Sequence, residues 1–197
     1  MADGPKPDGG TDPPARRDRA GLVALATWAL LAVPFIVAVT ALHRYHWYPL
    51  LDLAQTELRI RDVTSVHPPL VGLPGRIGAY LQGSHPGPLS FWGLAPFYRL
   101  FGATAWAMEA AAAVSNVAAL GCAIWIAKRR GGIALVLGVG AVLALLSRFY
   151  GPSLLTQAWN PYLPMLWFPV FLLAVWSVLC EDWVMLPVAV FAGSFCV

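Results

Sequence analysis

The chain has 197 residues, of which 58% are hydrophobic and only 12% are charged, and its mean hydropathy is +0.65. A soluble domain is about half apolar and about a quarter charged, so this composition excludes an ordinary soluble domain and favours a chain solvated largely by lipid. The net charge of +3 is small and gives no indication of a nucleic-acid partner.

The N-terminal region divides into a polar tail and an apolar run. Residues 1–20 are rich in Pro, Gly and Asp and predict a disordered tail. Residues 21–42 are apolar and uncharged, long enough to cross a hydrocarbon layer of about 30 Å. This run is too long for a secretory signal and no small-residue cleavage site follows it, so we expect an uncleaved membrane helix.

Four further apolar runs follow a long polar segment. The sequence predicts crossings at residues 106–127, 131–147 and 162–180, and an incomplete fifth run at 183–197. The fifth run is shorter than the ~17 to 25 residues that a crossing needs. These lengths predict the N-terminal part of a longer membrane protein, with 21–197 as its membrane domain.

The orientation follows from two basic clusters, at residues 16–19 and 128–130. Two crossings separate them, so both lie on one side, which the positive-inside rule assigns to the cytoplasm. Residues 43–105 then form an outer loop, in which 51–63 and 88–101 predict short helices. The expected fold is an all-α polytopic transmembrane helical bundle with an extracytoplasmic loop containing short interfacial helices.

The outer loop holds most of the charged side chains. Glu57 can pair with Arg61, and Arg59 with Asp62, because these spacings place side chains on one helix face. Such pairs either solubilise a surface helix or belong to a site. Asp52 has no partner at either spacing, which leaves an uncommitted carboxylate at the membrane surface.

Three other features bear on the site. The Pro- and Gly-rich turn at residues 83–89 fixes His85 at the rim of the bilayer, although a lone histidine in a loop is usually structural. Glu109 lies one turn inside the second crossing, where it can reach water or pair with an outer arginine, and a structural role is favoured. The three cysteines, Cys122, Cys180 and Cys196, have no metal-binding or redox spacing. No cluster of carboxylates in the sequence requires a metal either.

These features occur in a recognisable order. Asp52 and Glu57 precede the run His85-Pro86-Gly87-Pro88-Leu89, which is followed by Phe91-Trp92 and Leu100-Phe101-Gly102. Over residues 20–180 the chain resembles the start of the GT-C membrane glycosyltransferases, in the family 39-like branch of protein O-mannosyltransferases and lipid A aminoarabinose transferases. It departs from that pattern where Leu53 follows Asp52 and where His85 and Gly87 replace the more usual Lys and Pro.

The resemblance implies transfer of a sugar from a polyprenyl-phosphate carrier to a hydroxyl of a glycan, lipid or protein acceptor outside the cell membrane. It implies Asp52 as general base, with Glu57 as a second catalytic carboxylate. It also implies basic side chains near the lipid phosphate: His85 first, then Arg59, Arg61, Arg76 and Arg148. The branch generally needs no metal or other cofactor, and the sequence itself leaves metal dependence open.

Two alternatives stay open. A non-catalytic polytopic subunit would use the outer loop to bind a partner. A transporter is disfavoured, because only Glu109 places a charge inside a crossing. An inactive truncated glycosyltransferase paralogue is the other alternative, and residues 1–197 are expected to be inactive on their own.

Overall fold

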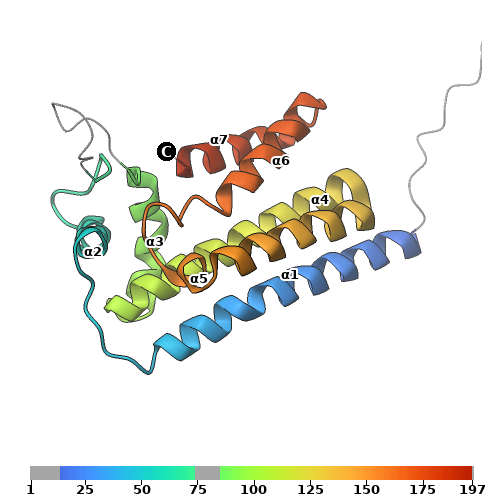
Figure 1. Cartoon of the computed structure of the whole chain (residues 1–197). Helices are drawn as coiled ribbons and strands as arrows, with labels where there is room; N and C mark the ends of the chain where they lie inside the picture. The colour runs from blue at the N-terminus through green and yellow to red at the C-terminus, as the bar shows by residue number, and fades with distance from the viewer. Residues whose placement is uncertain (1–13, 74–84, 197) are drawn as a thin grey trace, which may run out of the picture.

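The computed structural model describes residues 14–73 and 85–196, and within these ranges the chain is helical and contains no strand (Figure 1). The all-α prediction is therefore confirmed for the described residues. The elements in chain order are α1 (Pro14–Leu42), α2 (Asp52–Asp62), α3 (Pro88–Leu100), α4 (Ala105–Tyr150), α5 (Pro152–Thr156), α6 (Trp167–Leu179), the 3-10 turn η1 (Trp183–Met185) and α7 (Leu186–Phe195).

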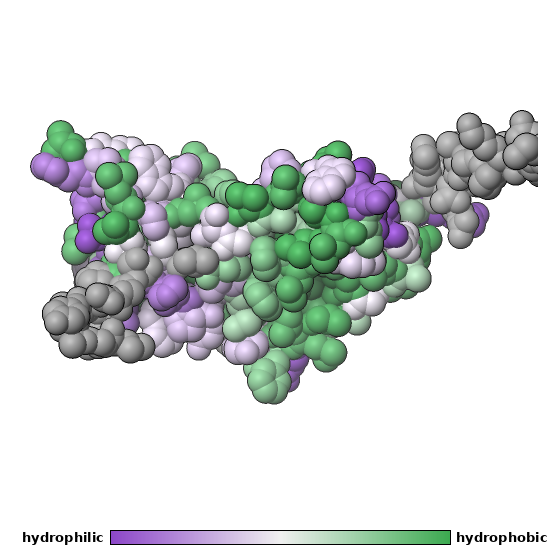
Figure 2. Space-filling model, turned by 90° about the horizontal axis from the view of Figure 1, so that it is seen from above, coloured by the Kyte–Doolittle hydropathy of each residue, from purple (hydrophilic) through white to green (hydrophobic). Residues whose placement is uncertain are grey.

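Two helices, α1 and α4, are long and apolar enough to cross a membrane. Only 22% of the most apolar window of α1 and 17% of that of α4 is buried inside the protein, whereas a core helix of a soluble protein is mostly buried. Large side chains such as Leu30, Ile36 and Leu145 are instead exposed. Figure 2 shows apolar side chains over the middle of one face, with polar ones toward both ends. This distribution indicates association with a membrane.

Helix α4 is broken into two arms at Gly132, where φ is 59° and ψ is −147°. A positive φ is costly for residues with a Cβ, so glycine permits the chain to reverse here. Figure 1 shows α4 doubling back on itself. The arms, residues 105–131 and 133–150, correspond to the predicted runs at 106–127 and 131–147.

Helix α1 packs against both arms of α4. The indole of Trp28 donates to the carbonyl of Val117 at 3.0 Å, and that of Trp106 donates to Val39 at 2.9 Å, so α1 runs antiparallel to the first arm. In the second arm, a Cβ added to Gly140 would lie 2.7 Å from Cγ2 of Thr27. The missing side chain lets the two backbones approach closely.

Helices α6 and α7 form a hairpin beside the first arm (Figure 1). Trp167 donates to Oγ of Ser115 at 3.0 Å near the start of α6, and Arg129 binds both carboxylate oxygens of Asp182, at 2.7 and 2.9 Å, beyond its end. Helix α6 begins at residue 167 rather than at the predicted 162. Proline at 164 disfavours helical backbone at the residue before it, which accounts for the later start.

The first helix also starts earlier than expected. Because α1 begins at Pro14, the predicted disordered tail is wrong for residues 14–20, and residues 1–13 lie outside the described part. Proline suits the first helical position, since its fixed φ is helical and it needs no hydrogen-bond acceptor there. Near this end of α1, a Cβ on Gly21 would lie 3.6 Å from Nζ of Lys128, so the two basic segments meet at one end of the bundle.

Candidate functional site

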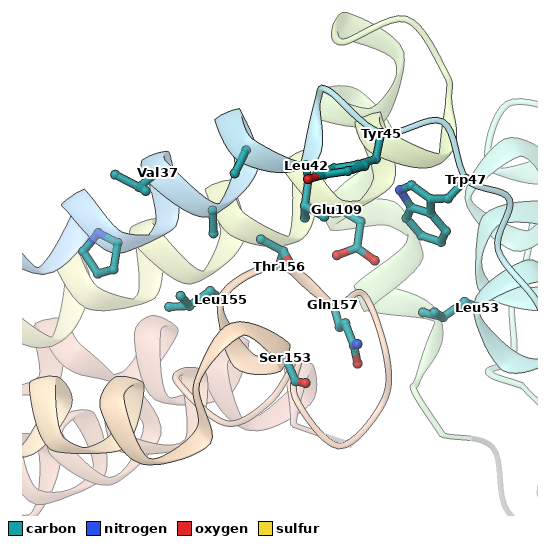
Figure 3. Close-up of a pocket in the computed structure, with 13 residues that line it drawn as sticks. Val37, Leu42, Tyr45, Trp47, Leu53, Glu109, Ser153, Leu155, Thr156 and Gln157 are labelled. Carbon is teal, nitrogen blue, oxygen red and sulfur yellow. The ribbon is translucent and has the colours of Figure 1, made fainter.

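The end of the bundle away from these basic segments contains a cavity of about 780 Å³ (Figure 3). The second arm of α4 ends at Tyr150 and is followed by α5, whereas α1 continues to Leu42. The cavity lies between the last two turns of α1, the start of α4 and α5. It is lined mainly by apolar side chains, with four polar ones (Pro34, Val37, Ala38, Ala41, Leu42, Tyr45, Trp47, Leu53, Glu109, Ser153, Leu155, Thr156 and Gln157). We call it the main groove.

The carboxylate of Glu109 points into the main groove (Figure 3). Its residue is only 3% exposed, and the side chain of Thr156 hydrogen-bonds to it. Of the two possibilities that the sequence left open, pairing with an outer arginine is not seen, since no cationic side chain among the described residues pairs with Glu109. Glu109 is thus a buried acidic group facing the main groove, which makes it a candidate site residue beside the structural role expected from the sequence.

A smaller cavity of about 320 Å³ extends the main groove along α1. Pro34 and Leu155 line both cavities, so the two cavities adjoin along α1, and we call them together the apolar path. Arg148 lies on the wall of the smaller cavity, near the end of the second arm. The structure therefore brings one predicted phosphate-binding residue, Arg148, into the same path as Glu109.

Asp52 lies beside the main groove, as the first residue of α2. Its side chain is exposed, and the indole of Trp159 donates to Oδ2 at 3.3 Å. The next residue, Leu53, lines the main groove. The predicted general base therefore stands at the margin of the cavity and forms no ion pair with a described residue.

Glu57 and Arg61 form the predicted pair, with Nη2 of Arg61 2.6 Å from Oε1 of Glu57. The pair includes a third member that the sequence did not indicate. The hydroxyl of Tyr98 in α3 lies 2.7 Å from the same Oε1, and it accepts from Nε of Arg61 at 2.8 Å. We call these three residues the α2–α3 clamp.

The α2–α3 clamp is partly buried. Glu57 is 7% exposed and Tyr98 1% exposed, and burial together with the hydrogen bond to Glu57 raises the pKa of Tyr98 to about 12. The hydrogen bonds to Tyr98 and Glu57 raise the pKa of Arg61. The clamp joins α2 to α3, which is more than the solubilising role considered for such pairs. The second predicted pair does not form, since no ion pair joins Arg59 to Asp62.

The other predicted phosphate-binding residues lie elsewhere. His85 is exposed in the segment before α3, and neither His85 nor Arg59 lines the main groove or its extension. Arg76 lies outside the described residues. In the described ranges, no group of three His, Cys, Asp or Glu side chains is placed to hold a metal ion.

Comparisons with family models, curated proteins and solved structures find no match to this chain. The main groove and the charged side chains around it are therefore the features that bear on its function.

Proposed function

We propose that this chain is part of a multi-pass membrane glycosyltransferase that moves a sugar from a polyprenyl-phosphate carrier to an acceptor hydroxyl. The observation that supports this proposal is the apolar path along α1, which has Arg148 on its wall and the carboxylates of Glu109 and Asp52 at or beside its main groove. An apolar path with a few polar groups at one end matches a ligand that has a long hydrocarbon chain and a polar head.

In this proposal α1 and the two arms of α4 cross the cytoplasmic membrane, and residues 162–180, of which α6 is the helical part, make the fourth crossing. The end with Lys128 and Arg129 faces the cytoplasm, in accordance with the positive-inside rule. The opposite end, with α2, α3 and the main groove, faces outward, and α2 and α3 lie at the interface as short helices. The reaction then takes place at the outer surface, where the phosphate of a lipid carrier would lie.

The charges suggest how the donor lies. Arg148 attracts a lipid phosphate, so the phosphate binds toward Arg148 and the isoprenoid chain follows the apolar wall. The sugar then lies toward Glu109, whose carboxylate, held by Thr156, can accept hydrogen bonds from sugar hydroxyls.

The chemistry follows from this orientation. Asp52 takes the proton of the acceptor hydroxyl as its oxygen forms a bond to the anomeric carbon. The bond from that carbon to the phosphate oxygen breaks, and the lipid phosphate leaves with its charge stabilised by Arg148. His85 and Arg59 stay candidates for contacts with the phosphate or the acceptor, and the proposal requires no metal.

Filling the main groove is expected to lower transfer. Val37 lines the groove and is 60% exposed, so Val37→Trp places an indole where the lipid would lie and is expected to raise the donor concentration needed for half-maximal transfer at least tenfold. Ile36 is 62% exposed and does not line the groove, so Ile36→Trp is the matched control. The measurement is transfer from polyprenyl-phosphate sugars in membranes, at varied donor concentration. Equal effects of the two substitutions would contradict the proposed donor site.

The orientation has its own test, which uses one native cysteine. Cys180 is exposed beyond the end of α6, at the end of the bundle with Asp182, and Ser65 is exposed after α2 at the opposite end. With Cys122 and Cys196 replaced by alanine, a membrane-impermeant maleimide is expected to label Ser65→Cys in intact cells and Cys180 only after lysis. The reverse pattern would place Asp52 in the cytoplasm and refute the orientation.

A further inference from the structure

A second cavity lies at the same end of the bundle as the main groove. It has a volume of about 540 Å³ and is bounded by the segment 43–49, by α2 and by the turn between α3 and α4. Tyr45 and Trp47 line both this cavity and the main groove, so these two side chains separate them. Helix α2 borders both as well, since Leu53 lines the main groove and Glu57, one turn later, lines the second cavity.

The wall of the second cavity is largely aromatic. Six rings contribute to it besides His46 (His43, Tyr45, Trp47, Tyr48, Phe101 and Trp106). Two of these rings are held in place: His43 and Trp106 meet edge to face at 4.6 Å between centroids, and the Trp106 indole donates to the carbonyl of Val39. Tyr45 and Tyr48 are exposed, so the cavity combines an anchored ring pair with aromatic side chains open to a ligand.

The carboxylate and the guanidinium that line this cavity are paired with each other. Among the described residues, Glu57 and Arg61 are the only carboxylate and guanidinium that line it, and they form an ion pair at 2.6 Å. The hydrogen bonds from Arg61 and Tyr98 both end on Oε1 of Glu57, which leaves Oε2 as an acceptor among the described residues. The hydroxyl of Thr104 and the ring of His46 add further donors and acceptors.

We propose that the second cavity binds a neutral saccharide. A sugar ring has C–H faces that pack against aromatic rings, because their slightly positive hydrogens meet the negative π-face, and it has hydroxyls around its rim that need both donors and acceptors. An aromatic wall with balanced polar groups matches this combination. An anionic or cationic ligand would find no unpaired carboxylate or guanidinium here.

The role of this saccharide as the acceptor rests on the proposed function. Asp52 begins the helix that borders both cavities, so a sugar in the second cavity lies across the Tyr45–Trp47 wall from the donor. The acceptor would then be a glycan or glycolipid rather than a side-chain hydroxyl of a protein.

Saccharide binding can be measured without any donor. The purified chain, in a detergent that lacks a sugar headgroup, is mixed with neutral disaccharides of glucose, mannose and galactose and with a Ser/Thr-containing peptide, and saturation transfer from protein to ligand protons is recorded by NMR. Transfer to at least one disaccharide is expected, and none to the peptide. Transfer to the peptide alone, or to no ligand, would overturn the proposal.

Replacing two exposed residues that line the cavity tests whether the saccharide binds there. His46 and Tyr48 line the cavity from the segment before α2, and Tyr48 is 86% exposed, so His46→Ala with Tyr48→Ala is expected to leave the helices intact and weaken disaccharide binding at least tenfold. His67 is exposed and does not line the cavity, so His67→Ala is the control. An equal loss of disaccharide binding in the double variant and in His67→Ala would refute the assignment of the saccharide to the second cavity. Saccharide binding by this chain, together with no sugar transfer from polyprenyl phosphates by the full-length protein, would instead contradict the proposed function alone.

Discussion

Replacing Asp52 with asparagine in the full-length protein is expected to lower sugar transfer by about 10² to 10⁴-fold, the usual contribution of a general base, while the amount of protein in the membrane stays unchanged. The side chain is exposed, and it accepts a hydrogen bond from Trp159, which an asparagine carbonyl can still accept. The substitution therefore removes the proton acceptor with little effect on the fold. The measurement is initial transfer rate at saturating donor, normalised to the amount of protein.

Asp62 provides the control for this experiment, because it is the last residue of the same helix and forms no ion pair with a described residue. Asp62→Asn is expected to retain transfer within about twofold. Retained transfer by Asp52→Asn would remove the general-base assignment. Equal loss in both variants would point to the charge of α2 rather than to one catalytic carboxylate.

Replacing Arg61 with leucine is expected to lower the free energy of unfolding by about 2–3 kcal/mol. The substitution leaves the carboxylate of Glu57, only 7% exposed, with Tyr98 as its one remaining partner in the clamp. Removing one member of a buried ion pair costs roughly 3–5 kcal/mol. The value expected here lies at or below the lower end of that range, because 53% of the Arg61 side chain is exposed. Thermal unfolding in detergent measures the loss.

Arg59→Leu is the matched control, since Arg59 lies in the same helix and has no ion-pair partner among the described residues. Its effect is expected to stay within about 0.5 kcal/mol. The double variant Glu57→Leu with Arg61→Leu should recover part of the lost stability, because no buried charge is left unpaired. A loss no larger for Arg61→Leu than for Arg59→Leu would contradict the clamp.

The same double variant separates two roles for Arg61. If Glu57 and Arg61 act on transfer only through stability, transfer recovers together with the unfolding temperature. Stability that recovers without transfer would show that Glu57 or Arg61 contacts a substrate, as the resemblance to membrane glycosyltransferases implies. The predicted catalytic role of Glu57 and phosphate-binding role of Arg61 are thus decided by one comparison.

Much of the local structure could be predicted because it depends on neighbours in the chain. The long apolar runs predicted α1 and the arms of α4, and the basic cluster at residues 128–130 marked the end of the first arm close to the break that the structure has at Gly132. The spacing of four residues predicted the ion pair of Glu57 with Arg61. Periodicity, helix-breaking residues and charges at fixed spacing act over a few residues, so the sequence alone determines them.

The candidate site required the tertiary structure. Asp52 and Trp159 are 107 positions apart, and no local pattern indicates that one donates to the other. The same holds for Tyr98, which joins Glu57 from another helix, and for Glu109, whose lack of a cationic partner among the described residues depends on what packs beside α4. The main groove exists because α1 extends beyond the second arm of α4, and a relative displacement of two helices is set by packing rather than by the residues of either one.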